Sequence, residues 1–268
     1  MKLCFIALLT FLYSLYAISA EFDSLGRLTS IDGKEEVSCP IQSKATAVIL
    51  VIGQSLSANH SSQKFSTLYP KSVTNYFNGK CYVAASPLLG ATSQYGEFMT
   101  PLADLLIKSK KFKSILIIAS GVGGSAISRW QHGGDINTGI SNTLDQLGKQ
   151  YQITHVIWQQ GESDYLERTA TTDYINSFNS LSKTLRSKNV RAPIFISVST
   201  KCGPDWIESN PISIAQNHLI NKNLVFLGVN SDQLLNIEDR TPDECHLMGS
   251  GQIKIARSYA DAILKHTR

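Results

Sequence analysis

Short apolar runs rich in β-branched residues alternate with helix-type patterns along this chain, and this alternation constrains its fold more than any other feature. Six runs are strand-like, and they cover residues 45–53, 81–86, 114–120, 154–159, 192–199 and 224–229. Other segments repeat apolar residues at spacings of three and four, as amphipathic helices do. These positions are Phe98, Leu102, Leu105 and Leu106, then Ile140, Leu144 and Leu147, then Tyr174, Phe178, Leu181 and Leu185, and finally Ile253, Ala256, Ala260, Ile263 and Leu264.

The strand-like runs are apolar along their whole length, which is typical of parallel strands covered on both faces. Because helix-type segments separate them, the sequence predicts an α/β fold, a three-layer α/β/α sandwich around a mostly parallel sheet. No repeat or low-complexity tract interrupts the pattern, and 268 residues, 43% of them hydrophobic, suffice for one core. We therefore expect residues 21–268 to form a single domain. The polar stretch 61–78 is interpreted as a surface excursion.

Residues 1–20, MKLCFIALLTFLYSLYAISA, have the layout of a secretory signal peptide: a lysine, an apolar stretch and a small-residue exit. An uncleaved membrane anchor is the alternative, but the apolar stretch is short for one. We expect cleavage near Ala20 and a secreted or periplasmic protein that does not bind a membrane. Basic residues are scattered, the formal charge is only +4, and the densest cluster, 108–113, fits a solvated helix end. We therefore expect no binding to nucleic acid. We also expect a monomer.

Four cysteines remain after the expected signal peptide: Cys39, Cys81, Cys202 and Cys245. An even number of cysteines in an exported chain predicts two disulfides, for which three pairings are possible. The cysteines show no C-x-x-C spacing, which would indicate a zinc site, and we expect no metal site.

Ligands of a parallel sheet bind at the loops that leave the carboxyl ends of the strands. The loop after the first long run reads GQSLSAN, residues 53–59. Gly53 has no Cβ at the sharp strand exit, and Ser55 can present its hydroxyl beside free backbone N–H groups. The motif is not the G-x-S-x-G nucleophile elbow, because Ser57 stands where that motif has its second glycine. Ser57 is itself a rival nucleophile.

A glycine-rich loop, SGVGGSAISRW, covers residues 120–130 after a later strand-like run. It lacks the third glycine of a dinucleotide fingerprint and a following Lys-Ser or Lys-Thr, which disfavours nucleotide binding. The N–H of Gly123 or of Gly124 can instead approach a developing oxyanion closely. A flexible turn is the alternative interpretation.

The stretch WQQGESD, residues 158–164, ends another run with amides and carboxylates. The Gln160 amide can donate a hydrogen bond toward the same oxyanion. Burial of Glu162 and Asp164 is unfavourable unless they are paired, so we interpret them as supports that fix the loop.

Asp243 and His246 lie three residues apart in TPDECHLMGSG, just before the last helical segment. An Asp carboxylate there can hold imidazole Nδ1–H while Nε2 acts as a base. Such a pair alone is more often a helix cap or a surface contact. Together with the serine, glycine and amide at other segment ends, it is much harder to explain as a cap or a surface contact, and it favours a catalytic site.

The ordered set GQS, GVGGS, WQQGESD and DECH resembles the SGNH hydrolases. Within them it is similar to the branch of sialate O-acetylesterase-like and acetylxylan-type carbohydrate esterases. The resemblance runs from about Ala45 to the end of the chain, and WQQGESD is its most specific element.

The resemblance implies a flavodoxin-like SGNH fold and a secreted serine esterase that removes O-acetyl groups from carbohydrates through an acyl-enzyme, without a cofactor. It implies that Ser55 is the nucleophile, His246 the base and Asp243 its orienting acid. The oxyanion hole would comprise the N–H groups of Ser55 and Gly123, with Gly124 as the competing glycine, and the side chain of Gln160; Gly53 and Gln54 would support the nucleophile loop. Leu56 departs from the usual G-Q-S-N pattern, and Asn59 is the candidate replacement for the missing asparagine.

The disulfide pairing follows from the expected edges of the sheet. Cys202 and Cys245 belong to the carboxyl edge, whereas Cys39 and Cys81 both precede strand-like runs at the opposite edge. We therefore predict the bonds Cys39–Cys81 and Cys202–Cys245.

The sequence constrains the identity of the substrate less than it constrains the catalytic residues. Trp130, Tyr165 and Trp206 could stack on a sugar or belong to the core, and Arg129 could meet a sugar carboxylate or form an ordinary salt bridge. Two other functions stay open: an SGNH esterase, lipase or thioesterase acting on non-sugar esters, and a catalytically silent carbohydrate-binding domain.

Overall fold

The computed structural model describes residues 21–148, 150–221 and 223–267, so the expected signal peptide lies outside the described residues. Its centre is a sheet in the order β1-β4-β3-β5-β2-β6-β7-β8. The strands are β1 (Glu36–Val37), β2 (Thr46–Gly53), β3 (Val73–Phe77), β4 (Lys80–Val83), β5 (Ser114–Ala119), β6 (His155–Gln159), β7 (Ile194–Val198) and β8 (Val225–Asn230). All neighbouring pairs are parallel except the two that involve β4.

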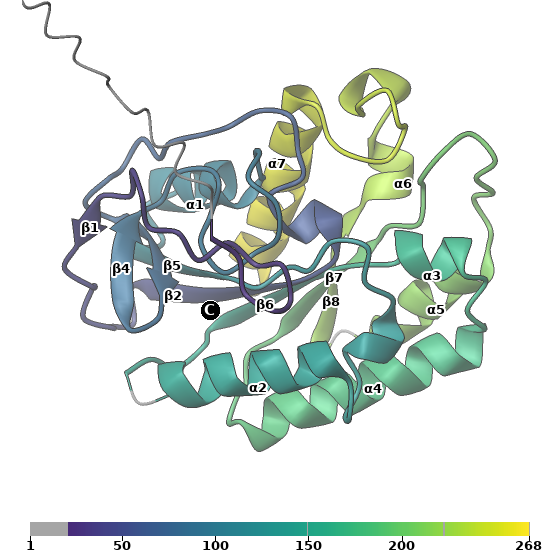
Figure 1. The fold of residues 1–268 in the computed structure, drawn as a ribbon, viewed down its shortest axis with the longest axis horizontal. Coiled ribbons are helices and arrows are strands. Elements are labelled where there is room, and N and C mark those ends of the chain that lie inside the picture. The colour runs from purple at the N-terminus through teal and green to yellow at the C-terminus, as the bar shows by residue number, and fades with distance from the viewer. Residues whose placement is uncertain (1–20, 149, 222, 268) are drawn as a thin grey trace, which may run out of the picture.

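Helices cover both faces of this sheet (Figure 1). The α-helices are α1 (Met99–Lys108), α2 (Asp135–Leu147), α3 (Glu162–Leu166), α4 (Thr171–Ser187), α5 (Pro211–Leu219), α6 (Ser231–Leu234) and α7 (Gly249–His266). Three short 3-10 helices are η1 (Ser55–Ser57), η2 (Ile127–Arg129) and η3 (Ile237–Asp239). The predicted α/β/α sandwich with a mostly parallel sheet is confirmed.

Alternate residues of β2 build the two cores. Ala47, Ile49 and Val51 pack with residues of α1 and α7, whereas Val48, Leu50 and Ile52 pack with residues of α2, α4 and α5. Every residue of β2 is buried. This burial on both faces explains why the run is apolar throughout, since neither side of the strand meets water.

Two strands, β1 and β3, were not predicted from the sequence: β1 has only two residues, and the polar residues of β3 are buried. β3 lies inside the stretch 61–78, which we interpreted as a surface excursion, and this interpretation is wrong for residues 73–77. Asn75 is 2% exposed, and its amide exchanges hydrogen bonds with the backbone N–H and C=O of Leu89. A buried polar side chain with such partners is tolerated in a sheet but breaks the apolar pattern on which the prediction relied.

The two predicted disulfides, Cys39–Cys81 and Cys202–Cys245, are confirmed. They close loops of similar length, with sequence separations of 42 and 43 residues. The first ties the N-terminal segment to β4, and the second joins the loop after β7 to the loop before α7.

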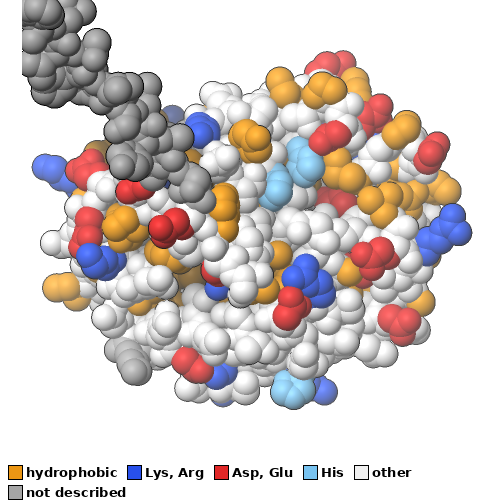
Figure 2. Space-filling view, viewed as in Figure 1, with side chains coloured by type: hydrophobic (Ala, Val, Ile, Leu, Met, Phe, Trp, Pro, Cys, Tyr) orange, Lys and Arg blue, Asp and Glu red, His pale blue; other side chains and the backbone are white. Residues whose placement is uncertain are grey.

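On the face drawn in Figure 2, basic and acidic side chains of the described residues are interspersed and form no continuous patch of one sign. Within the described ranges, no helix combines the length and the apolar character that crossing a bilayer requires.

Candidate active site

The predicted site residues come from loops at one edge of the sheet. Because β2, β5 and β6 are parallel neighbours, the loops that follow them leave the same edge. Ser55 follows β2, Gly123 follows β5 and Gln160 follows β6. Asp243 and His246 lie in the segment that precedes α7.

The nucleophile loop begins with a sharp turn at Gly53. Gly53 has a φ of +129°, and a Cβ there would run into the backbone carbonyl of Gln159 on β6, so only glycine fits this strand exit. Gln54, 3% exposed, follows and accepts hydrogen bonds from the N–H groups of Ser163 and Gly161 through Oε1, at 3.0 and 3.3 Å. Gln54 thus ties the nucleophile loop to the WQQGESD loop.

The two candidate nucleophiles differ in their surroundings. Ser57 is completely buried, and its hydroxyl donates to the carbonyl of Gln54 at 2.8 Å. Ser55 is 5% exposed, and its hydroxyl has no hydrogen-bond partner among the described residues. Of the two, Ser55 therefore has the more accessible hydroxyl.

Asn59 braces the nucleophile loop from its far end. Its side chain donates to the carbonyl of Leu88 and accepts from the N–H of the same residue, both at 2.8 Å. Leu56, which replaces the asparagine of the usual motif, is buried in the apolar core instead.

Asp243 and His246 form the pair that the sequence predicts. Asp243 Oδ2 accepts a hydrogen bond from His246 Nδ1 at 2.6 Å, while Oδ1 accepts from the Thr241 hydroxyl and from the backbone N–H groups of Cys245 and His246. Partial burial alone would raise the pKa of Asp243, but these hydrogen bonds hold it well below its usual value. The carboxylate therefore stays ionised throughout the range in which imidazoles titrate.

A second imidazole joins this pair to the nucleophile loop. The rings of His60 and His246 stack with centroids 5.6 Å apart and an interplanar angle of 17°. Beside them, the N–H of Ser62 donates to the carbonyl of Leu247 at 2.8 Å. The loops that carry Ser55 and His246 are thus in contact, although they are far apart in the sequence.

His60 is not among the site residues predicted from the sequence. Its place five residues after Ser55, in a loop at the carboxyl edge, was the available signal. Burial, with a smaller contribution from His246, lowers the pKa of His60 to about 4, so this ring is neutral near pH 7.

The backbone of Gly123 lies close to the ring of His60. A Cβ on Gly123 would lie 2.5 Å from Nε2 of His60, and the Gly123 N–H donates to Thr92 Oγ1 at 2.8 Å. Gly124 has a φ of +64°, and a Cβ there would meet no neighbouring atom among the described residues, so only its backbone conformation favours glycine. An oxyanion role for the Gly123 N–H requires the bond to Thr92 to be exchanged.

Gln160 is fully buried and already hydrogen-bonded. Its Nε2 donates to the carbonyl of Ser125 at 3.1 Å and to the carboxylate of Asp164, while its Oε1 has no partner among the described residues. Both hydrogens of the amide are thereby engaged, so Gln160 reaches an oxyanion only after a change of side-chain position.

Glu162 and Asp164 are buried supports, as the sequence predicts. Asp164 accepts a hydrogen bond from the N–H of Ile127 at 2.8 Å and thereby connects the WQQGESD loop to η2. Glu162 accepts from the hydroxyl of Ser199, which follows β7. Burial raises the pKa of Glu162 to about 7, and the Ser199 hydrogen bond only partly opposes this shift.

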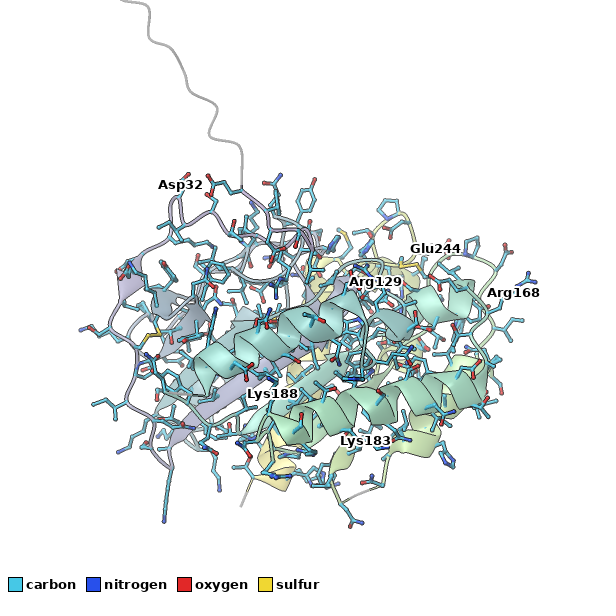
Figure 3. The ribbon with its side chains drawn as sticks, turned by 60° about the horizontal axis from the view of Figure 1, so that its bottom comes forward. Asp32, Arg129, Arg168, Lys183, Lys188 and Glu244 are labelled. Atoms are coloured by element: carbon cyan, nitrogen blue, oxygen red, sulfur yellow. A yellow bond between two sulfur atoms is a disulfide. The ribbon has the colours of Figure 1, made fainter. Side chains whose placement is uncertain are left out.

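Arg240 and the second disulfide hold the loop of the Asp-His pair. Arg240 is 4% exposed, and its guanidinium donates to the carbonyls of Cys245 at 2.9 Å and Lys201 at 3.2 Å. The Cys202–Cys245 bond joins the same two backbone segments. One of the disulfides is visible as a yellow bond beside Glu244 in Figure 3.

The residues considered for substrate contact fall into two groups. Trp130 is fully buried, and its ring meets Trp158 edge to face, so it belongs to the core. Arg129 forms an ion pair with Asp135 at 2.7 Å near the start of α2 (Figure 3). Tyr165 and Trp206 are partly exposed, and the Tyr165 hydroxyl donates to the carbonyl of Asp205 at 3.1 Å in the loop of Trp206.

No group of three or more His, Cys, Asp or Glu side chains in the described part of the chain is arranged to hold a metal ion.

The chain matches the family model described as "Carbohydrate esterase, sialic acid-specific acetylesterase" over residues 46–265. A curated relative from Arabidopsis thaliana, named "Probable carbohydrate esterase", is 27% identical over 152 residues, which are 56% of this chain. The match covers 55% of that relative, so this chain spans about half the length of the curated relative that it matches.

Solved structures share the fold. The crystal structure of an Arabidopsis thaliana protein has a TM-score of 0.65 and 20% identity, and the match covers 84% of this chain and 99% of that one. The structure of NanS has a TM-score of 0.53 and 18% identity, with 83% and 97% covered. A carbohydrate acetylesterase from Sinorhizobium meliloti has a TM-score of 0.53 and 12% identity, with 82% and 99% covered.

Proposed function

Because the chain belongs to the family of sialic acid-specific acetylesterases among the carbohydrate esterases, we propose that it is a serine esterase that removes O-acetyl groups from carbohydrates. The observation that carries the proposal is the contact between the Ser55 loop and the Asp243–His246 pair, made through the stacked ring of His60. This contact joins a free hydroxyl, a base and an orienting carboxylate in one region.

In the proposed reaction His246 Nε2 accepts the Ser55 proton while Oγ attacks the acetyl carbonyl. Asp243 holds the ring through Nδ1–H and stabilises the imidazolium that forms. The tetrahedral intermediate collapses when His246 returns the proton to the sugar oxygen, and the deacetylated sugar leaves. Water then attacks the acetyl-Ser55 ester with the same base, which releases acetate and restores the hydroxyl.

Three groups are proposed for the oxyanion hole: the N–H of Ser55, the N–H of Gly123 and the amide of Gln160. In the structure, the N–H of Gly123 donates to Thr92, and the amide of Gln160 donates to Ser125 and Asp164. Catalytic hydrogen bonds often form only in the complex with substrate, so we propose that these donors exchange partners as the oxyanion develops.

The proposed setting is outside the cell or in the periplasm. Two disulfides support it, because such bonds persist in oxidising compartments. The signal peptide at residues 1–20 and a single SGNH domain over residues 21–268 remain predictions from the sequence.

The experiment that tests this function is the release of acetate from acetylated sialic acid, acetylated xylan and acetylated peptidoglycan fragments, in parallel with an acyl-length series of p-nitrophenyl esters. We expect acetate release from at least one carbohydrate, and a preference for acetyl over longer acyl groups. A preference for long acyl chains would select a lipase or thioesterase instead. Failure of a fluorophosphonate probe to label Ser55 would indicate a silent binding domain.

A further inference from the structure

His60 has a specific arrangement that the proposed mechanism does not use. Its ring stacks on His246, and its Nε2 lies 2.9 Å from Thr92 Oγ1. Thr92 Oγ1 is also the acceptor for the N–H of Gly123. A continuous set of contacts therefore runs from the glycine loop through Thr92 and His60 to the ring of the base.

The stack restrains the freedom that the Asp243 hydrogen bond leaves to His246. A single bond at Nδ1 fixes one end of an imidazole ring but allows the ring to swing about that bond. The side chain of His246 is 27% exposed, and water on its exposed side does not fix the orientation of the ring. A flat ring packed on one face, itself held at its far end by Thr92, opposes this swing.

The stacked ring is also suited to the charge that appears during the reaction. His246 carries a positive charge whenever it holds the Ser55 proton, and a neutral aromatic face within about 6 Å attracts a cation. Burial keeps His60 neutral near pH 7, so it offers such a face without adding a repelling charge.

We propose that His60 is a positioning residue of this active site, which holds the His246 imidazole by stacking and is itself anchored by Thr92. The proposal rests on the esterase function proposed above. His60 acts through His246 and does not contact the acetyl group or the sugar.

The test compares three substitutions of His60 that separate its ring from its polar end. His60→Ala removes both, His60→Phe keeps a flat face, and His60→Gln keeps a polar end for Thr92 without a ring. The substrate is the acetylated carbohydrate that the wild-type protein hydrolyses, or p-nitrophenyl acetate. His132→Ala is the matched control, because His132 is an exposed histidine in the turn before α2.

We expect His60→Ala and His60→Gln to lower kcat about tenfold with KM changed less than about twofold, which corresponds to the loss of one cation–aromatic contact. His60→Phe should recover most of kcat, and His132→Ala should match the wild type. A rise in KM at constant kcat would overturn the proposal, because it would make His60 a substrate-binding residue. Recovery by Gln but not by Phe would also overturn it, because the Thr92 bond alone would then explain the effect.

A spectroscopic measurement keeps the proposal falsifiable if His60→Phe folds poorly. The proton between His246 Nδ1 and Asp243 should give a downfield proton resonance in the wild type, which Asp243→Asn removes. We expect His60→Gln to broaden or abolish this resonance while its melting temperature stays close to that of the wild type. An unchanged resonance in a folded His60→Gln variant would contradict the positioning role. A wild-type protein that releases no acetate and whose Ser55 is not labelled would instead reject the esterase function itself.

Discussion

His246 Nδ1 donates to Asp243 Oδ2 at 2.6 Å, and the other oxygen of Asp243 accepts from Thr241, Cys245 and His246 of the same turn. The carboxylate therefore fixes both the backbone of the turn and the ring that it carries. A short D-x-x-H segment can therefore hold an imidazole in a fixed orientation without a long supporting element.

Asp243→Asn tests the orienting role of this carboxylate. An amide can keep the shape of the turn but can present its N–H to Nδ1, which favours the wrong tautomer of His246. We expect kcat for acetyl release to fall by about 1,000-fold to 10,000-fold. The melting temperature should also fall, because the ionised carboxylate with its lowered pKa stabilises the folded state. A loss below tenfold would show that Asp243 serves the turn rather than the reaction.

Ser55→Ala and Ser57→Ala distinguish the two candidate nucleophiles. The Ser57 hydroxyl is buried and already bonded to the Gln54 carbonyl, whereas the Ser55 hydroxyl is free among the described residues. We expect Ser55→Ala to lower p-nitrophenyl acetate hydrolysis by at least about 1,000-fold. Ser57→Ala should keep activity within about tenfold and mainly lower stability, by about 1 kcal/mol for a lost buried hydrogen bond. The reverse order of effects would reject Ser55.

The two disulfides offer a comparison matched in loop length. Cys202→Ser with Cys245→Ser, and Cys39→Ser with Cys81→Ser, open loops of 43 and 42 residues, so each pair should lower stability by a similar amount, about 2–4 kcal/mol. Only the first pair releases the turn of Asp243 and His246. We therefore expect activity, measured well below the melting temperature, to fall in that variant alone. Equal activity losses would show that the bond has no specific role at the site.

Glu162→Gln tests the buried carboxyl. Its pKa of about 7 lies above the usual value of 4.5, so the folded protein binds a proton that the unfolded chain releases between these values. The contribution of Glu162 to the free energy of unfolding of the wild type should therefore decrease as pH rises from about 4.5 to 7, by about 1 kcal/mol per pH unit.

Gln at this position stays neutral and keeps an acceptor for Ser199. Relative to the wild type, Glu162→Gln should therefore gain stability progressively over this pH range, as urea unfolding at several pH values would reveal. His60 and His155, whose pKa values of about 4 make the protein lose stability as pH falls, are present in both proteins and cancel in the difference. A pH-independent difference would mean that Glu162 is ionised throughout.

Gly123→Ala and Gly124→Ala separate the two glycines of the proposed oxyanion loop. A methyl group on Gly123 would lie 2.5 Å from His60 Nε2 and displace the stacked ring, whereas one on Gly124 meets no neighbour among the described residues. We expect Gly123→Ala to lower kcat at least about tenfold more than Gly124→Ala, whose effect is a backbone strain of about 1–2 kcal/mol on stability. Equal kcat values would remove the link between this glycine and the base.

Local sequence patterns were sufficient to predict the layers of this fold. β2 and β6 are apolar runs buried on both faces, and the pattern of Tyr174, Phe178, Leu181 and Leu185 matches the buried face of α4. β3 was not predicted because the buried side chain of Asn75 hydrogen-bonds to the backbone of Leu89, a contact between distant residues that no local pattern indicates. On α7, Ile255 and Tyr259 are buried whereas Ile253 and Leu264 are only partly so, because the packing of the helix against α1 and β8 sets its rotation.

The sequence by itself identified the segments to which we assign the chemistry, because GQS, WQQGESD and DECH stand at ends of segments that periodicity could identify. It also led to the correct pairing of the cysteines, although the expected edge was wrong for Cys81: β4 is antiparallel to β3, and Cys81 lies opposite Tyr76 near the carboxyl end of β3. Only the tertiary structure decided how these loops meet. In it the ring of His60 stacks on His246, and the Gly123 N–H and the Gln160 amide donate to acceptors within the protein. Hydrogen bonds and ring stacking depend on side-chain positions across distant loops, which the spacing of residues along a chain does not specify.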